Sequence, residues 1–222
     1  MLRASVTDPL ALLPGPPAIR TRRIPRCTAC ALPPPLCLCG ELHAMAVTPR
    51  TSVVLLMHHA ELYKSTSTGR LLHRVIPSAH LRLRGAPEGP APAPLLPERR
   101  LLLFPDPSAP VISPELVNDE PVALLIPDGT WKQARRITQR DPAVLGAQRV
   151  NLPPGAPSRY GLRRSPRPEA LSSFEAAARA LGVLEGEAIE TRLMAAFDLW
   201  VERSREVREH GEQIAPSCRA GA

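Results

Sequence analysis

Four of the five cysteines in this chain lie close together near the N-terminus, in a pattern that can bind a metal ion. They are Cys27, Cys30, Cys37 and Cys39, a C-x2-C pair followed by a C-x-C pair. Four thiolates at this spacing are typical of a tetrahedral zinc site, in which no position stays open for water. The sequence therefore predicts a structural zinc. An iron–sulfur cluster uses the same ligands and stays open as an alternative, although nothing else in the chain indicates redox chemistry.

A second group of candidate residues follows the apolar run at residues 122–126 (VALLI). The chain continues with Asp128, Gly129, Thr130 and Trp131 and then enters a polar segment that we expect to be helical. Open α/β sheets bind ligands where a buried strand ends before a helix, and a carboxylate there can act as a general base. The alternative is local: Asp128 or Thr130 caps the helix, Gly129 forms the turn, and Trp131 packs beneath it.

A run rich in hydroxyl groups follows another apolar segment, residues 53–57 (VVLLM), and the pair His58 and His59. Residues 64–70 read KSTSTGR. Their hydroxyls and backbone amides can face a ligand, although a series of helix caps explains the same composition. For the two histidines, we expect a core or capping role. The ligand candidates in the run are Ser65, Thr68, Gly69 and Arg70.

Short, continuous apolar runs indicate the fold class that positions these residues. Residues 53–57, 101–104 and 122–126 have the length of buried strands, and residues 149–152 form a fourth, shorter candidate. Predicted helices alternate with them. We therefore expect an α/β fold with a mainly parallel sheet and flanking helices.

Two helices are predicted near the C-terminus. Ser172 and Glu175 form a capping box that should open a helix ending near Gly182. A second helix is expected from about residue 187 to 210, with Gly211 as its stop. The apolar residues that recur in it at helical spacing are Ile189, Leu193, Phe197, Trp200 and Val207.

Charge is distributed unevenly along the chain. The formal net charge is +7, but residues 1–168 carry 22 basic and 11 acidic side chains, whereas residues 169–222 carry 6 and 10. The basic part is the part expected to meet nucleic acid. Of the 28 basic residues 26 are arginines, a bias that a GC-rich genome also produces. Arginine nevertheless suits phosphates, because its planar fork donates two hydrogen bonds to one anion.

The remaining composition indicates where the protein works and how it is divided. No run of about 18 apolar residues occurs, so we expect no membrane span. Prolines interrupt the apolar patch near the N-terminus, which makes a poor signal peptide, and we therefore expect a cytoplasmic address. The predicted parts are a leader (1–19), a zinc knuckle (20–45), an α/β catalytic domain (46–212) with a proline-rich insertion (86–97), and a tail (213–222).

The motifs occur in an order that resembles the DTW-domain family. That family has a C-x2-C, Leu-Pro, C-x-C cluster like residues 27–39, a Thr-Gly-Arg-Leu segment like residues 68–71, and the D-x-T-W signature seen at residues 128–131. A basic aromatic loop like residues 159–163 (RYGLR) and a Ser-x-x-Glu helix like residues 172–175 follow. The resemblance covers roughly residues 20 to 210. The proline-rich insertion and the proline- and arginine-heavy stretch after Arg163 depart from the family pattern.

The resemblance implies a tRNA-uridine aminocarboxypropyltransferase, which moves the 3-amino-3-carboxypropyl group of S-adenosylmethionine to N3 of a uridine and releases methylthioadenosine. It also implies a SPOUT-like fold, in which the cofactor lies among loops that can be knotted. Tyr160 and Arg163 join the cofactor-binding candidates, and Asp128, Thr130 and Trp131 become the catalytic ones. We expect tRNA and S-adenosylmethionine as partners, and a monomer.

Uridine N3 carries an imide proton and is a weak nucleophile until that proton leaves, so a general base is required. Asp128 is our candidate for it. Because N3 lies on the Watson–Crick edge, the base must be unpaired, and Trp131 or Tyr160 can stack on it, although Trp131 fits the core better. Thr130 and the first amides of its helix can bind the cofactor carboxylate or a phosphate. Arginines near Tyr160 can clamp either anion.

Three other functions stay open at this point. The same fold and donor can act on ribosomal RNA, or methylate instead. A non-catalytic zinc-knuckle protein can bind RNA through its arginines, with an affinity that falls steeply with salt. A zinc-stabilised protein-interaction domain is the third.

Overall fold

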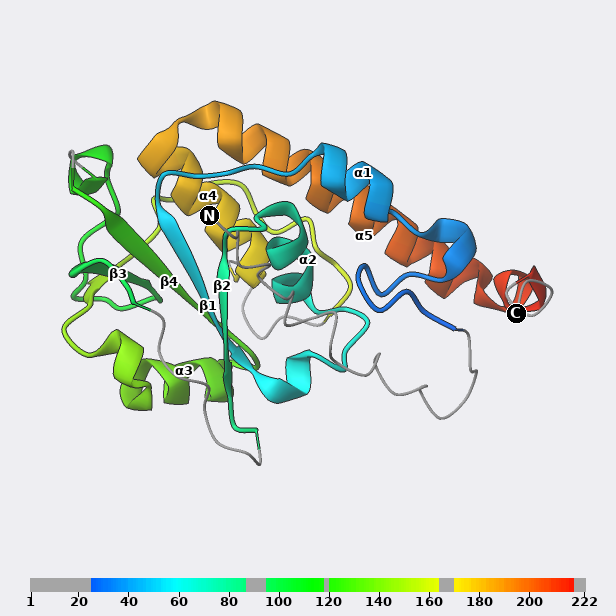
Figure 1. The fold of residues 1–222 in the computed structure, drawn as a ribbon, viewed down its shortest axis with the longest axis horizontal. Helices are drawn as coiled ribbons and strands as arrows, with labels where there is room; N and C mark the ends of the chain where they lie inside the picture. The colour runs from blue at the N-terminus through cyan, green and yellow to red at the C-terminus, as the bar shows by residue number, and fades with distance from the viewer. Residues whose placement is uncertain (1–24, 87–94, 118–119, 164–169, 218–222) are drawn as a thin grey trace, which may run out of the picture.

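The computed structural model describes residues 25–86, 95–117, 120–163 and 170–217. Within these residues, five strands form one parallel sheet in the order β2-β1-β4-β3-β5 (Figure 1). The predicted α/β class with a parallel sheet is confirmed. The strands are β1 (Ser52–His58), β2 (His80–Arg84), β3 (Arg99–Leu103), β4 (Val122–Asp128) and β5 (Gln148–Val150). The α-helices are α1 (Cys39–Ala44), α2 (Thr68–Val75), α3 (Trp131–Arg140), α4 (Ser173–Glu185) and α5 (Glu187–Ser217).

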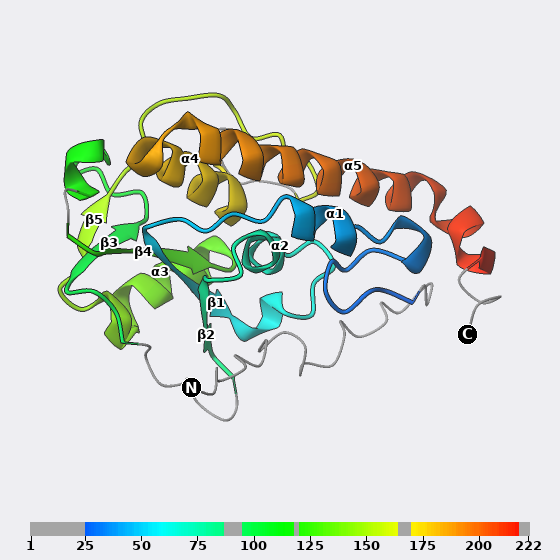
Figure 2. The ribbon, with the colours of Figure 1, turned by 45° about the horizontal axis from the view of Figure 1, so that its top comes forward.

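Helices cover both faces of the sheet, which explains the continuous apolar runs of its two central strands. All seven residues of β4 and the central five of β1 are buried. Val53, Leu55 and Met57 face a large core that includes residues of α2, α4 and α5, whereas Val54 and Leu56 face a smaller core with Ile137 of α3. Figure 2 shows α3 on the opposite side of the sheet from α2, α4 and α5. A strand buried on both faces needs a continuous apolar run rather than an alternating one.

The carboxyl ends of β1 and β4 form the point where the fold can hold a ligand. The two central strands are paired so that Met57 lies opposite Asp128. The chain leaves β1 toward α2 on one face and leaves β4 toward α3 on the other. A crevice outside the strand ends is expected at such a switch in direction.

Strand β2 was not predicted, because its sequence HLRLR places a charged residue at a core position. Arg82 in the middle of β2 is buried, and its Nε donates to Asp141 Oδ1 at 3.0 Å. Arg84 Nε lies 2.9 Å from Asp141 Oδ2. Asp141 is fully buried and also accepts from the amide of Ala143. The carboxylate neutralises the arginines, so β2 can lie in the sheet.

The two predicted C-terminal helices are present, but their ends differ from the prediction. Gly182, the expected end of α4, lies inside the helix, where a methyl group would be 2.8 Å from Glu190 Cβ of α5. Its lack of a side chain therefore allows the close approach of α4 and α5. The helix ends instead at Glu185, and Gly186 follows with φ 105°. Helix α5 continues to Ser217, with a kink at His210 just before the predicted stop.

Some predicted segments lie outside the described residues: the leader 1–19, the basic residues 20–23, most of the insertion 86–97, Arg164 and Cys218. No helix within the described residues combines the length and apolar character that a membrane crossing requires.

Replacing Asp141 by Asn should lower the free energy of unfolding by about 3 kcal/mol, because it leaves buried guanidinium groups without a counter-charge. Urea denaturation measures the change. Asp198→Asn is the matched control: that carboxylate is 44% exposed and pairs with Arg159, so its loss should cost less than about 1 kcal/mol. Equal effects of the two substitutions would show that the Asp141 cluster does not hold β2 in place.

Candidate active site and metal centre

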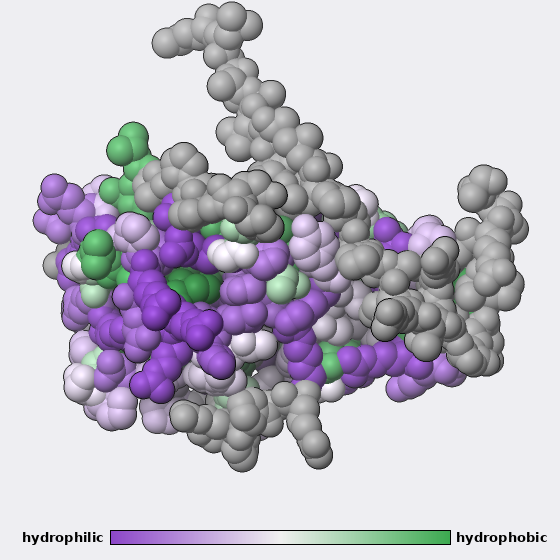
Figure 3. Space-filling model, turned by 90° about the horizontal axis from the view of Figure 1, so that it is seen from below, coloured by the Kyte–Doolittle hydropathy of each residue, from purple (hydrophilic) through white to green (hydrophobic). Residues whose placement is uncertain are grey.

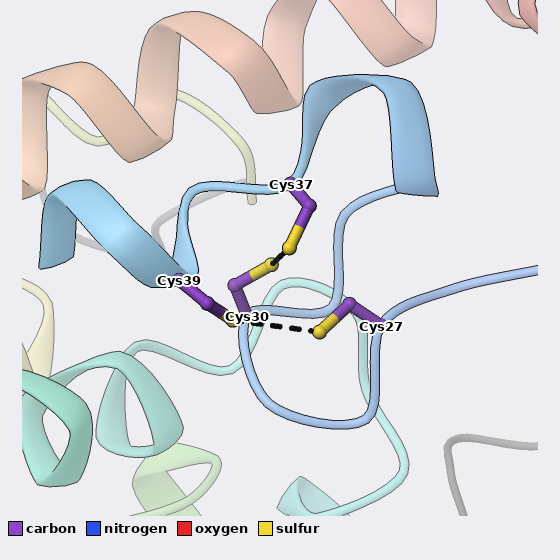
Figure 4. A group of neighbouring side chains, drawn as sticks. All are labelled: Cys27, Cys30, Cys37 and Cys39. Carbon is purple, nitrogen blue, oxygen red and sulfur yellow. Dashed lines mark hydrogen bonds between the residues drawn. The ribbon is translucent and has the colours of Figure 1, made fainter. Parts of the chain in front are cut away.

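The four N-terminal cysteines converge as the sequence predicts (Figure 4). Their Sγ atoms all lie within 4.8 Å of one another, with 3.5 Å between Cys27 and Cys39 and 3.7 Å between Cys30 and Cys37. Four sulfurs around a zinc ion at about 2.3 Å are separated by about 3.8 Å, so the cluster has the size of a tetrahedral site with four thiolate ligands. None of the four is in a disulfide. The donor set and its spacing fit a metal ion.

The cysteine loop is part of the main core rather than a separate knuckle on the surface. Leu32, Leu38 and Leu42 are buried in the same core as the sheet and α5. Trp200 of α5 donates from Nε1 to the carbonyl oxygen of Cys30 at 2.9 Å. Arg70 donates to the carbonyl oxygens of Thr28 and Leu62. Residue 70, predicted to bind the cofactor, therefore points into the cysteine loop and ties it to α2.

Asp128 lies at the end of β4 and is buried against the first turns of two helices. Its Oδ1 accepts a hydrogen bond of 2.5 Å from Ser173 Oγ at the start of α4, and Oδ2 is buried without a partner among the described residues. On its other side is Gly69 of α2. A methyl group at position 69 would be 2.5 Å from Asp128 Oδ2 and 2.7 Å from the Met57 methyl. Only glycine lets α2 approach the carboxylate this closely.

Burial raises the pKa of Asp128 to about 6, because the charged carboxylate loses its water. The hydrogen bond from Ser173 opposes the rise, and the negative charge of Glu61 adds to it. Asp128 is therefore mostly ionised at neutral pH, yet it is a stronger base than an ordinary aspartate. A carboxylate with one unpartnered oxygen in a buried position destabilises the fold, which is typical of a functional site rather than of a cap.

The hydroxyl-rich loop and the basic aromatic loop meet beside Asp128, although 94 residues separate Thr66 from Tyr160. Tyr160 donates from its hydroxyl to the carbonyl oxygen of Thr66, and Arg163 donates from Nε to Thr66 Oγ1 at 2.9 Å. Arg163 also pairs with Glu61 at 2.9 Å, and Lys64 pairs with the same buried carboxylate. The two predicted ligand loops thus form one wall.

Several polar atoms of this wall are buried without a partner among the described residues: Ser67 Oγ, Arg163 Nη2 and Asp128 Oδ2. Ser67 precedes α2 but makes no side-chain cap, so the first amides of α2, including those of Thr68 and Gly69, have no side-chain acceptor there. Ser65 is half-buried at the edge of the loop. A guanidinium, a hydroxyl and helix amides together are suited to bind a carboxylate.

Thr130 and Trp131 lie on the other side of the strand end. Thr130 is exposed and forms a capping box with Gln133, so its predicted alternative role as a helix cap is confirmed. Trp131 is half-buried, and its ring centroid lies 6.0 Å from that of Phe104 at the end of β3. The four residues 128–131 are therefore divided between the two faces: the carboxylate on the α2 side and the indole on the α3 side.

Two further predictions concern residues next to the site. His58 Nδ1 accepts from the amide of Ala60, which confirms the capping role for this histidine. Glu175 closes its predicted capping box with Ser172 and also accepts from Ser158 Oγ and the Arg159 amide. It thereby positions the loop that carries Tyr160.

Ser173, Glu61 and Phe104 border the site but were not predicted. Nothing local marks them: Ser173 follows a capping serine, Glu61 lies in a short turn, and Phe104 directly follows a strand. Their contacts with Asp128, Arg163 and Trp131 join residues far apart in the chain. Only the packed structure brings them together.

The purified protein should contain one zinc ion per chain, measured by elemental analysis. Removing it with a chelator should lower the thermal midpoint by several degrees, because metal binding contributes to folding. Cys37→Ser should lose the zinc, whereas Cys218→Ser, which changes the fifth cysteine, should keep it. Stoichiometric iron with sulfide would instead establish an iron–sulfur cluster.

Ionisation of Asp128 should lower the stability of the folded protein as pH rises. Its folded-state pKa of about 6 exceeds the value of 3.8 for an ordinary aspartate, so the folded state binds more protons between these values, and stability is lost as pH increases through them. Relative to Asp128→Asn, the wild-type free energy of unfolding should fall by about 1 kcal/mol between pH 5 and pH 7. Denaturant titrations at both pH values measure the difference. A constant difference would mean that the pKa of the carboxyl group is not raised.

Comparison with known proteins places this site in a family. Residues 24–205 match the family profile described as the DTW domain. A protein of Macaca fascicularis named tRNA-uridine aminocarboxypropyltransferase 2 is 32% identical over 187 residues, which cover 80% of this chain and 61% of the relative. A protein of Arabidopsis thaliana named tRNA-uridine aminocarboxypropyltransferase A is 28% identical over 210 residues, 77% of each chain.

The chain spans 61% of the length of the Macaca fascicularis relative. It spans 60% of the length of a Mus musculus relative that is also named tRNA-uridine aminocarboxypropyltransferase 2. No solved structure matches it significantly. Because the family profile covers most of the sequence, from the four clustered cysteines into α5, the chain belongs to the DTW-domain family.

Proposed function

We propose that this protein transfers the 3-amino-3-carboxypropyl group of S-adenosylmethionine to N3 of a uridine in tRNA and releases methylthioadenosine. The observation that carries the proposal is Asp128, a buried carboxylate with raised pKa and one unpartnered oxygen. It lies at the paired ends of β1 and β4, where the connections to the next helices leave to opposite faces. The names of the relatives from Macaca fascicularis and Arabidopsis thaliana support the same reaction.

The chemistry asks little of the protein beyond positioning and proton removal. The donor supplies a sulfonium, whose positive charge already activates the leaving group. The electron pair of uridine N3 forms the new N–C bond. The C–S bond breaks at the same time, and its bonding electrons move to sulfur. The N3 proton leaves to a base. Asp128 is the proposed acceptor of that proton, since its carboxylate is ionised at neutral pH and more basic than usual.

The proton must reach a carboxylate that is itself covered. Asp128 is buried, whereas Ser173 is half-buried and its hydroxyl donates to Asp128 Oδ1. We assign Ser173 as the link: its Oγ accepts the N3 proton while its own proton moves to Asp128. Burial makes Asp128 accept this proton more readily than an ordinary aspartate, because it disfavours the charged form.

The wall beside Asp128 is the proposed donor site. Arg163 and the first amides of α2 would hold the carboxylate of the donor, and Ser67 and Ser65 offer hydroxyls to its other polar groups. Tyr160 and Glu61 act indirectly, because the phenol fixes the carbonyl oxygen of Thr66 and the glutamate orients Arg163. Burial raises the pKa of Tyr160, which keeps the phenol protonated as a donor.

The target base would be held on the opposite side of the strand end. Trp131 and Phe104 are both half-buried and form a tilted aromatic pair beside Thr130. Such a pair can stack on a uracil that has left its pairing partner. The assignment of the parallel sheet to the SPOUT-like class, the knotted arrangement that the class includes, and the cytoplasmic location stay predictions from sequence and resemblance.

Incubation with S-adenosylmethionine and an unmodified tRNA transcript should yield aminocarboxypropyl-uridine, detected by mass spectrometry of nucleosides, together with methylthioadenosine. Loss of the base in Asp128→Asn should lower the rate about 10²- to 10⁴-fold. The wild-type rate should rise with pH through about 6, where Asp128 becomes ionised, and this rise should be absent from the variant. Glu206→Gln on α5, a partly exposed carboxylate that pairs with Arg203 on the same helix, should keep both rate and pH dependence.

Other outcomes identify the alternatives. S-adenosylhomocysteine in place of methylthioadenosine would establish a methyltransferase. Product on ribosomal RNA alone would change the substrate. Tight binding of tRNA with no product under any condition would favour a non-catalytic RNA-binding protein.

A further inference from the structure

Helix α3 presents an exposed face that is strongly basic. Ala134, Ile137 and Thr138 are its buried residues and face the sheet. The opposite side is exposed and carries four cations, Lys132, Arg135, Arg136 and Arg140. Hydrophilic side chains gather over α3 on the face of the molecule shown in Figure 3. We call these four residues the α3 basic face.

These cations differ from several arginines near the sheet that have a carboxylate partner. Arg82 and Arg84 pair with Asp141, and Arg163 pairs with Glu61. Within the described residues, none of the four side chains of the α3 basic face forms an ion pair, and α3 itself contains no acidic residue. Four uncompensated cations on one short helix repel one another, so the face is suited to a polyanion that neutralises them.

The position of the helix relative to the site favours a nucleic acid. Helix α3 begins at Trp131, three residues after Asp128, and the indole packs on Phe104. Cations therefore extend directly from the proposed stacking pair. The C-terminal part of the chain, which includes α4 and α5 on the other face of the sheet, carries more acidic than basic side chains and would repel the same partner.

We propose that the α3 basic face binds the phosphate backbone of the RNA strand that carries the target nucleotide. This inference rests on the proposed function and adds the docking surface to it. Eight residues separate Lys132 from Arg140, a rise of about 12 Å along the helix. Charges over that length can contact roughly three phosphates of one strand. The contacts fix the position of the RNA, while the aromatic pair meets the base.

The test compares tRNA binding by wild type with that of Arg135→Gln/Arg136→Gln/Arg140→Gln, over a series of salt concentrations. The substitution should weaken binding roughly 10- to 100-fold at 0.1 M salt and reduce the slope of log K against log salt by about 2 to 3. The corresponding triple Lys variant keeps the charges and should keep the slope. A matched pair of single variants controls for the loss of charge alone. Arg136→Gln removes one charge from the α3 basic face, and Arg203→Gln removes one from α5, where Arg203 pairs with Glu206.

The outcomes separate this inference from the proposed function. Wild-type activity with unchanged affinity and slope in the triple Gln variant would overturn the docking surface and leave the reaction standing. Absence of both tRNA binding and product in wild type would overturn the proposed function instead. Equal affinity of wild type for polyglutamate and tRNA would show a general polyanion surface and overturn the assignment to RNA. The thermal midpoint should be unchanged in all variants, because the substituted side chains are exposed.

Discussion

The pairing of β1 with β4 is the constraint on which the rest of the structure depends. Because the two strands are parallel and in register, both carry their last residues to the same edge of the sheet, with Met57 opposite Asp128. The connections that follow leave to opposite faces, because α2 packs in the large core on one side of the sheet and α3 in the smaller core on the other. This divergence places a carboxylate on one side and the Trp131–Phe104 pair on the other. The buried carboxylate proposed as the proton acceptor and the aromatic pair proposed to stack on the target base thus lie on either side of one strand end.

Two buried aspartates show how the surroundings decide the role of one side-chain type. Asp141 is completely buried, but both its oxygens accept hydrogen bonds and two guanidinium groups neutralise it, so the cluster supports β2. Asp128 is buried to nearly the same degree, yet one oxygen has no partner among the described residues and Glu61 adds negative charge nearby. The first arrangement is satisfied in the folded state, whereas the second is incompletely satisfied and responds to protons. The surroundings of Asp141 therefore suit a structural role, and those of Asp128 suit the proton transfer proposed for it.

The four-cysteine cluster is connected to the candidate active site through the core. Leu32, Leu38 and Leu42 pack with the sheet, Trp200 holds the loop to α5, and Arg70 links it to the turn that carries Glu61. A metal ion at the four cysteines would therefore stabilise the start of α2, where Gly69 meets Asp128. The sequence motif suggests Arg70 as an anion ligand, but its guanidinium forms this connection instead, and Arg163, whose Nη2 has no partner among the described residues, is the arginine that we propose for that role.

The sequence by itself determined features whose causes are local. Four cysteines within 13 residues define a cluster of thiols that can hold a metal ion, continuous apolar runs define buried strands, and residues 128–131 define a strand-to-helix junction. Capping boxes at Thr130 and Ser172 define helix starts. Tertiary structure alone decided which distant groups meet. Arg82 can be a core residue because it pairs with Asp141. The pKa of Asp128 is raised because α2 and α4 exclude water from its carboxylate. The physical reason is that propensities and ligand spacings act over a few residues, whereas burial and charge neutralisation depend on partners that folding brings from elsewhere in the chain.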